Sequence, residues 1–158
     1  MNFKDLITGF AAQLGLSDVN VDDDIVSISV DDFIVNIQNL IELNKIIVYA
    51  EIAERPPDDD GLLAEVLLQS NYMYRGTGGG TISQDPETKK YYFTRIDDLA
   101  VVTVESFVEQ FEKLTNYLEN WRKIIADYRP AARSTAAAAD SATDAPANNT
   151  GDDWMMRI

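Results

Sequence analysis

The spacing of apolar residues predicts a short amphipathic helix followed by three strands. Apolar side chains recur at helical spacing over residues 3–14, between a candidate N-cap at Asn2 and a candidate C-terminal stop at Gly15. Residues 25–30 and 33–41 alternate apolar and polar positions, which predicts two half-buried strands joined by a tight turn. Residues 46–53 carry apolar side chains on both faces, as a central strand does. These three strands should form a meander.

The second half of the pattern predicts a helix, a hairpin and a long final helix. Residues 61–74, with Asp60 as the expected N-cap, are apolar on nearly all sides. A strand near residues 80–83, an Asp-Pro turn and a strand over residues 90–97 follow. Thr103 caps the last helix, whose apolar period continues to Pro130. The order α-β-β-β-α-β-β-α predicts an α+β sandwich with a twisted antiparallel sheet.

Composition divides the chain into a domain over residues 1–130 and a tail over residues 131–158. The tail is rich in Ala, Ser, Thr, Asp and Asn, which cannot bury enough apolar area to offset the entropy of ordering, so a flexible segment is expected. Its end carries a short apolar cluster, with Trp154, Met155, Met156 and Ile158 beside two aspartates. This cluster is either an unstructured terminus or a short docking peptide.

The charge and the missing residue types exclude several classes of function. The 158 residues carry 13 basic and 27 acidic side chains, a formal charge of −14 that repels nucleic acid and anionic membranes. There is no cysteine and no histidine, which excludes disulfides and both Ser-His and Cys-His catalysis. No apolar run is long enough to cross a membrane. We expect a cytoplasmic protein with no nucleic-acid partner, no membrane insertion and no catalytic residue.

The glycines between the predicted helix and hairpin favour a structural hinge over a nucleotide site. Gly76, Gly78, Gly79 and Gly80 permit a sharp reversal, because glycine adopts positive φ at little steric cost. A phosphate loop needs a lysine after its last glycine, a dinucleotide fingerprint needs glycine where Thr81 stands, and both place a strand before a helix. No cofactor is therefore predicted.

The acidic triplet at residues 58–60 is also better explained by structure than by metal binding. Aligned on a calcium-binding loop, the chain has Pro56 at the first ligand position and Leu67 at the last, where a bidentate glutamate is required. Negative charge just before a helix is favoured by the helix dipole. No metal site is predicted.

The helix over residues 61–74 poses a packing problem, since a small sandwich has one interior for it to face. Two solutions are open. A twofold dimer would bury the second apolar side against its own copy. Alternatively, the helix lies inside the monomer beneath the long C-terminal helix.

Several motifs resemble one known family. Residues 67–72 read LLQSNY, residues 77–83 read TGGGTIS, and Asp85-Pro86 follows. They are similar to the Leu-Leu-x-Ala-Asn, Thr-Gly-Gly and Leu-Asp-Pro pattern of the class I type III secretion chaperones, the Tir chaperone family of Gram-negative bacteria. The last helix is similar as well, with Phe107, Leu118 and Trp121. The resemblance covers about residues 1–130, and the tail is outside the family pattern.

The resemblance implies a cytoplasmic homodimer that binds the N-terminal segment of one or more type III secreted effectors. It would keep them soluble and secretion-competent without ATP hydrolysis, and secretion ATPase or sorting components are further candidate partners. The effector-binding candidates are Phe3, Ile7, Phe10, Ile25, Ile34 and Leu40. The dimer-interface candidates are Leu63, Leu67, Ser70, Tyr74 and Tyr92. The alternatives are a regulatory interaction module of the same fold that senses partner occupancy, and a carboxylate-dependent enzyme, disfavoured because no acidic pair is singled out.

Overall fold

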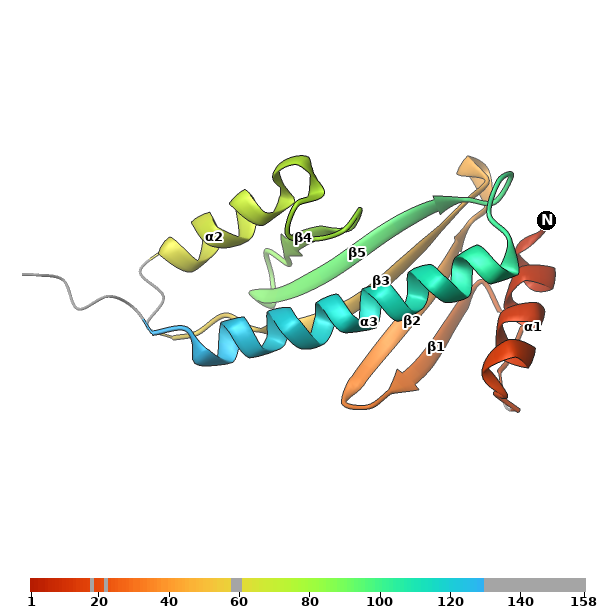
Figure 1. The fold of residues 1–158 in the computed structure, drawn as a ribbon, viewed down its shortest axis with the longest axis horizontal. Coiled ribbons are helices and arrows are strands. Elements are labelled where there is room, and N and C mark those ends of the chain that lie inside the picture. Colours follow the sequence, from red (N-terminus) through yellow and green to blue (C-terminus); the bar gives the residue numbers. More distant parts are fainter. Residues whose placement is uncertain (18, 22, 58–60, 130–158) are drawn as a thin grey trace, which may run out of the picture.

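The fold comes from a computed structural model that describes residues 1–17, 19–21, 23–57 and 61–129. Within these ranges the chain forms α1 (Phe3–Leu14), β1 (Ile25–Val30), β2 (Phe33–Leu40), β3 (Lys45–Glu54), α2 (Leu62–Asn71), β4 (Thr81–Gln84), β5 (Lys90–Asp98) and α3 (Val104–Asp127) (Figure 1). Two short 3-10 turns, η1 (Ile41–Leu43) and η2 (Tyr72–Tyr74), complete it. The element order and the α+β class are as the sequence predicts. The tail lies outside the described residues.

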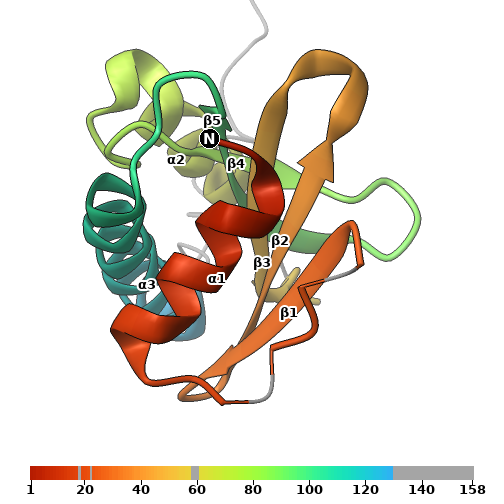
Figure 2. The ribbon, with the colours of Figure 1, turned by 90° about the vertical axis from the view of Figure 1, so that its right-hand side faces the viewer.

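The five strands form one antiparallel sheet in the order β1-β2-β3-β5-β4, so β3 is central and β1 and β4 are the edges. Helices α1 and α3 lie on one side of it (Figure 2). Between them and the sheet is the core, where Phe10 makes edge-to-face contacts with Phe107 and Phe111 at centroid distances of 5.0 and 4.9 Å. Since successive strand residues point to opposite faces, the core receives side chains from one face of the sheet, such as Val35, Val48 and Phe93.

Local sequence explains where most helices begin and end. The side chain of Asn2 accepts a hydrogen bond from the Asp5 amide at the start of α1, and Gly15 ends it with φ of 68°. Thr103 and Ser106 form a capping box at the start of α3. The expected cap Asp60 lies outside the described residues, and Gly61 directly precedes α2.

Helix α2 is shorter than its apolar pattern predicts. The pattern continues to residue 74, but the α-helix ends at Asn71, and Met73 and Tyr74 both adopt left-handed backbone angles with φ of 55°. The amide of Gly76 donates to the carbonyl of Ser70 at 3.0 Å, which turns the chain back toward the helix end. An ideal Cβ on Gly76 would lie 2.6 Å from the Ser70 Cβ, so this close approach requires glycine.

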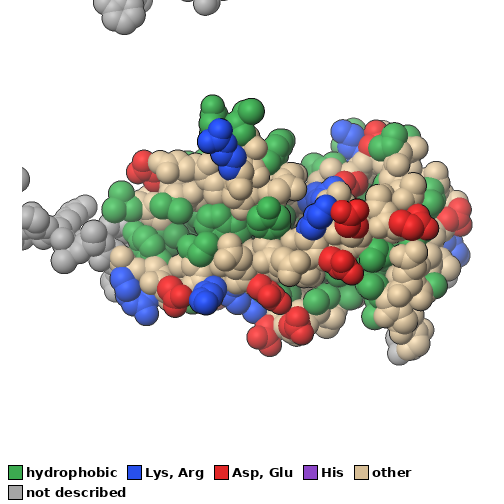
Figure 3. Space-filling view, viewed as in Figure 1, with side chains coloured by type: hydrophobic (Ala, Val, Ile, Leu, Met, Phe, Trp, Pro, Cys, Tyr) green, Lys and Arg blue, Asp and Glu red, His purple; other side chains and the backbone are tan. Residues whose placement is uncertain are grey.

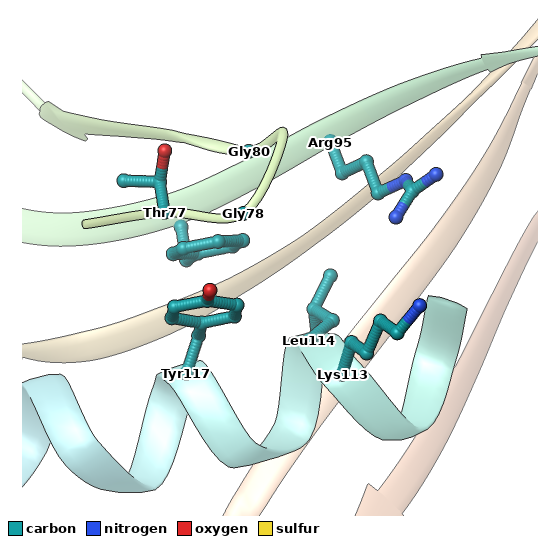
Figure 4. Close-up of a pocket in the computed structure, with 8 residues that line it drawn as sticks. Thr77, Gly78, Gly80, Arg95, Lys113, Leu114 and Tyr117 are labelled. Atoms are coloured by element: carbon teal, nitrogen blue, oxygen red, sulfur yellow. The ribbon is translucent and has the colours of Figure 1, made fainter. Parts of the chain in front are cut away.

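The glycine-rich turn attaches the end of α2 to α3 (Figure 4). The Tyr117 ring of α3 lies beneath Gly78, where an added Cβ would be 2.4 Å from it, and stacks on Phe93 at 6.0 Å. The Trp121 indole donates to the Gly76 carbonyl at 2.9 Å. Of the four glycines in the predicted hinge, Gly78 and Gly79 have positive φ. Gly76 and Gly80 instead lie so close to Ser70 and Phe93 that a Cβ atom would clash with these residues. The turn therefore reverses the chain between α2 and β4 and packs against α3.

Candidate partner-binding surfaces

The outer face of the sheet, turned away from α1 and α3, carries exposed apolar side chains. The burial pattern alternates along β1 and β2, so that the residues between the core positions point outward. Ile34 is 62% exposed and Ile25 is 47% exposed on this face, and Leu40 is partly buried on it. Three of the six effector-binding candidates named from the sequence are thus brought to one surface.

The register adds residues of the central strands to the same surface. Ile47 of β3 lies between Gln38 of β2 and Ile96 of β5, and Ile96 is 54% exposed. Tyr49 follows two residues along β3 with its side chain partly exposed. We call this surface the outer sheet face, and its apolar members are Ile25, Ile34, Leu40, Ile47, Tyr49, Tyr92 and Ile96. The sequence-based candidates did not include Ile47, Tyr49 and Ile96. The available signal was that these apolar residues occupy strand positions that face away from the core.

The other three effector-binding candidates lie in the core. Ile7 and Phe10 are fully buried and Phe3 is 7% exposed, because α1 directs its apolar side against α3 and the sheet. The expectation that these residues form part of an effector surface is corrected by this burial: they hold α1 in place. The amphipathic pattern identified the stripe correctly, but it did not identify what covers the stripe.

The edge strand β1 borders the outer sheet face and adjoins a surface hollow. This hollow has a volume of about 290 Å³ and is lined by Gly15, Leu16, Ser17 and Val19 on one side and by residues 27–29 of β1 on the other. An edge strand presents backbone N–H and C=O groups that an extended peptide can pair with. Strand β1 and its hollow could therefore receive an added strand with one side chain inserted.

The opposite edge of the sheet is protected by a side chain. The Asn71 amide donates to the Ile82 carbonyl of β4 at 3.0 Å and accepts from the Ile82 N–H at 2.8 Å. The side chain thus pairs with the strand as a neighbouring strand would. This blocks strand addition at Ile82 and gives Asn71 a role that sequence reasoning missed.

Acidic residues surround the β1–β2 edge, while the ion pair of Lys90 with Glu51 lies on the outer sheet face. Asp23 and Asp24 precede β1, and Asp31 and Asp32 form the turn that follows it. On the face itself the Lys90 ammonium lies 2.9 Å from the Glu51 carboxylate, and this hydrogen bond raises the pKa of Lys90. The acidic border would attract a partner with basic residues flanking its apolar ones.

Helix α2 and η2 expose a second apolar surface. Leu62, Val66, Leu68, Tyr72, Met73 and Tyr74 are between 43% and 71% exposed. Of the dimer-interface candidates, Leu63, Leu67 and Ser70 are buried beneath the helix, Tyr74 is exposed, and Tyr92 lies on the outer sheet face. The proposed placement of Leu63, Leu67 and Ser70 in an interface is therefore corrected, because their side chains pack inside their own chain. The alternative prediction, that this helix lies inside the monomer beneath the long C-terminal helix, is also wrong, because Leu62, Val66 and Leu68 are exposed.

The residues that the structure describes contain neither a cluster of metal-binding side chains nor a helix that could span a membrane. No group of three or more Asp or Glu side chains there is arranged to hold a metal ion. No helix in the same ranges has the length and apolar character needed to cross a membrane.

Structural comparisons place the fold among known proteins. The chain resembles one in the crystal structure of the ExsC-ExsE complex, with a TM-score of 0.66, 19% identity and coverage of 77% of this chain and 92% of that one. It also resembles one in the HopA1-SchA chaperone-effector complex, with a TM-score of 0.64, 14% identity and coverage of 77% and 93%. YbjN, a putative transcription regulator from E. coli, has a TM-score of 0.53, 19% identity and coverage of 77% and 87%. These likenesses establish the fold.

Sequence comparison identifies the family. None of the curated protein sequences matches the chain. The sequence profile of the Tir chaperone protein (CesT) family matches residues 5–122, which extend from α1 to the last turns of α3 and include the glycine-rich turn, Asn71 and every strand. The match covers well over half of the chain, and we conclude that this protein belongs to the Tir chaperone protein (CesT) family.

Proposed function

We propose that this protein is a cytoplasmic type III secretion chaperone that binds a segment of a secreted effector and keeps it secretion-competent without ATP hydrolysis. Membership of the chaperone family supports a binding function over an enzymatic one. The observation that carries the proposal is the outer sheet face, where Ile25, Ile34 and Ile96 are each about half exposed or more on a single surface. An apolar surface of this kind marks an interaction site.

The geometry favours a non-globular partner segment. Such a segment can add a strand to β1, place one side chain in the adjoining hollow and lay apolar side chains across the outer sheet face. A folded partner would present its own backbone already paired. The formal charge of −14 would keep the complex soluble while the partner remains unfolded.

Co-purification from the source cytosol, followed by binding measurements with the purified partner, tests this function. The partner should be a protein that the secretion system exports, bound through its first hundred or so residues. Ile34→Asp should weaken binding at least about tenfold, which corresponds to about 1.4 kcal/mol. Val101→Asp is the matched control, because Val101 is 77% exposed and lies outside the outer sheet face. Equal binding by both variants would reject the outer sheet face as the site.

The exposed side of α2 supports a homodimer as the working form. Leu68, Tyr72 and Met73 are each about 70% exposed, and a twofold arrangement would bury them against their own copies. An apolar hollow of about 240 Å³ beside them, lined by Leu67, Leu68 and Ile82 among others, could receive a side chain of the partner copy. Light scattering of Leu68→Asp tests this: the variant should be monomeric and folded, and an unchanged dimer would exclude this side of α2.

A regulatory interaction module is the second candidate. The likeness to YbjN, described as a putative transcription regulator, supports it. Such a module would report whether a partner is bound without escorting it to export. Recovery of a transcription factor or a membrane ring component, with no exported protein, would favour this function.

A further inference from the structure

An apolar band on the helical side of the molecule is not used by the proposed function. Apolar side chains gather along α2 and between it and the C-terminal half of α3 (Figure 3). Leu62 and Val66 on α2 are 47% and 43% exposed, and Ile124 on α3 is 38% exposed. We define the α2–α3 band by these three residues, by the partly buried Tyr117 of α3 and by the partly buried Tyr128, which directly follows α3.

Helical spacing and the glycine-rich turn explain why these residues face one another. Tyr117 and Ile124 are seven residues apart, so they share one side of α3, and Tyr128, the C-cap, follows four residues after Ile124. The contact of Tyr117 with Gly78 turns that side toward the segment that ends α2. The two helices run in opposite directions, so that the start of α2 lies beside the end of α3 (Figure 1). Leu62 therefore lies at the same end of the molecule as Tyr128.

The chain itself continues from this end. Arg129, the last residue described, lies two residues beyond the end of α3, and 24 further residues, 130–153, separate it from Trp154. Taken as the flexible chain that its composition predicts, such a connector has a root-mean-square span of about 25–30 Å. Helix α2, with ten residues, is about 15 Å long. The band is thus well within reach of residues 154–158.

Composition makes residues 154–158 a suitable occupant. The sequence Trp-Met-Met-Arg-Ile supplies large apolar side chains of the kind enriched at interfaces, and methionine adapts to irregular apolar surfaces. Asp152 and Asp153 directly precede it. The end of α3 and the two residues after it carry Arg122, Lys123 and Arg129 against one acidic side chain, Asp127, which gives a net positive region on a strongly acidic chain. The charges therefore favour the same placement.

We infer that residues 154–158 dock in cis on the α2–α3 band, with Trp154 covering the apolar surface between Val66 and Ile124. A flexible connector of this length gives an effective concentration in the millimolar range. A segment that binds with a Kd of about 0.1 mM in isolation would then be docked for about nine-tenths of the time. Docking would shield one side of α2 and leave Leu68 and the outer sheet face uncovered.

Fluorescence of Trp154 in the full chain tests the inference. The difference between the emission of the unaltered chain and that of Trp154→Phe isolates Trp154, and acrylamide quenching measures its exposure. Trp154 should be quenched about fivefold less than in a synthetic peptide of residues 150–158, given the docked fraction above. Val66→Asp and Ile124→Asp should each remove this protection, while Val101→Asp, at a more exposed apolar residue outside the band, should not. Circular dichroism verifies that the variants are folded.

The oligomeric state of the same samples separates docking in cis from docking on a second copy. Protection should persist on dilution and in the Leu68→Asp variant, whose substitution lies on another side of α2. Protection that is lost on dilution would assign the band to a second copy and overturn the inference. Quenching of Trp154 equal to that of the peptide, or protection that survives both Val66→Asp and Ile124→Asp, would overturn it as well. None of these measurements requires an effector.

Discussion

Replacing Asn71 by alanine should destabilise the domain by about 2 kcal/mol. The side chain makes two hydrogen bonds to the Ile82 backbone, at 3.0 and 2.8 Å, in a partly buried setting. Each such bond contributes about 0.5–1.5 kcal/mol net, and their loss leaves an N–H and a C=O of β4 to be solvated at a partly covered edge. The loss is a substantial fraction of the 5–15 kcal/mol that is typical of a domain.

Urea unfolding at a fixed protein concentration measures this change, with Gln69→Ala as the control. Gln69 is also an amide on α2, and its hydrogen bond, to Glu65 at 3.0 Å, lies on the exposed side of the helix. Its removal should cost less than about 0.5 kcal/mol. Fixing the concentration matters because dimer formation would add its own contribution to stability.

Hydrogen exchange provides a local measurement of the same interaction. The Ile82 amide donates to the Asn71 side chain, so its exchange should accelerate in Asn71→Ala more than that of the β5 amides. If Asn71→Ala and Gln69→Ala unfold at the same urea concentration and Ile82 exchange is unchanged, the pairing contributes nothing to the edge. The assignment of Asn71 as edge protection would then be refuted.

The remaining predictions concern the α2 core, the glycine-rich turn and one carboxylate. Leu67→Asp should unfold the chain, because Leu67 is 3% exposed, whereas Leu68→Asp should leave it folded, since Leu68 is 70% exposed; circular dichroism distinguishes the two. Gly80→Ala should cost about 2 kcal/mol or more in urea unfolding, because its Cβ would lie 2.3 Å from the Phe93 ring, and an unchanged midpoint would contradict this close approach. The Asp85 carboxylate accepts hydrogen bonds from the Glu87 backbone N–H and from the Thr88 hydroxyl. These bonds lower the pKa of Asp85 below its usual value of 3.8. The resulting stability is present above the unfolded pKa and is lost as pH falls through the folded one, so Asp85→Asn should be less stable at pH 7 and equal in stability at acid pH.

The order of elements could be predicted because the apolar period changes clearly between strands and helices. The end of α2 could not be predicted in this way. Residues 72–74 continue the apolar pattern, yet Met73 and Tyr74 adopt positive φ because the Gly76 amide bonds back to Ser70. This bond depends on contacts of the following turn with α3, such as that of Trp121 with Gly76. Sequence periodicity contains no information about such long-range contacts.

Only part of the candidate site could be predicted, again because the sequence pattern does not show which elements pack together. An apolar stripe on α1 shows that the helix is covered on one side, but only the packing of Phe10 against Phe107 shows that the cover is α3. Ile34 gave a more informative pattern. It lies at a solvent-phase position of β2, where alternation predicts a polar residue, and it is 62% exposed. An apolar residue out of phase in a strand is therefore a better indication of a binding surface than one in phase in a helix.

The outer sheet face and the exposed side of α2 lie far enough apart in the fold to be used together. The outer sheet face is on the side of the sheet away from α1 and α3, whereas the exposed side of α2 borders the β4 edge, where Asn71 already pairs with Ile82. A copy bound at α2 would therefore leave β1 accessible, because β1 and β4 are opposite edges of one sheet. A dimer built on α2 would present two β1 edges and two outer sheet faces, on which a single long unfolded segment could bind in succession.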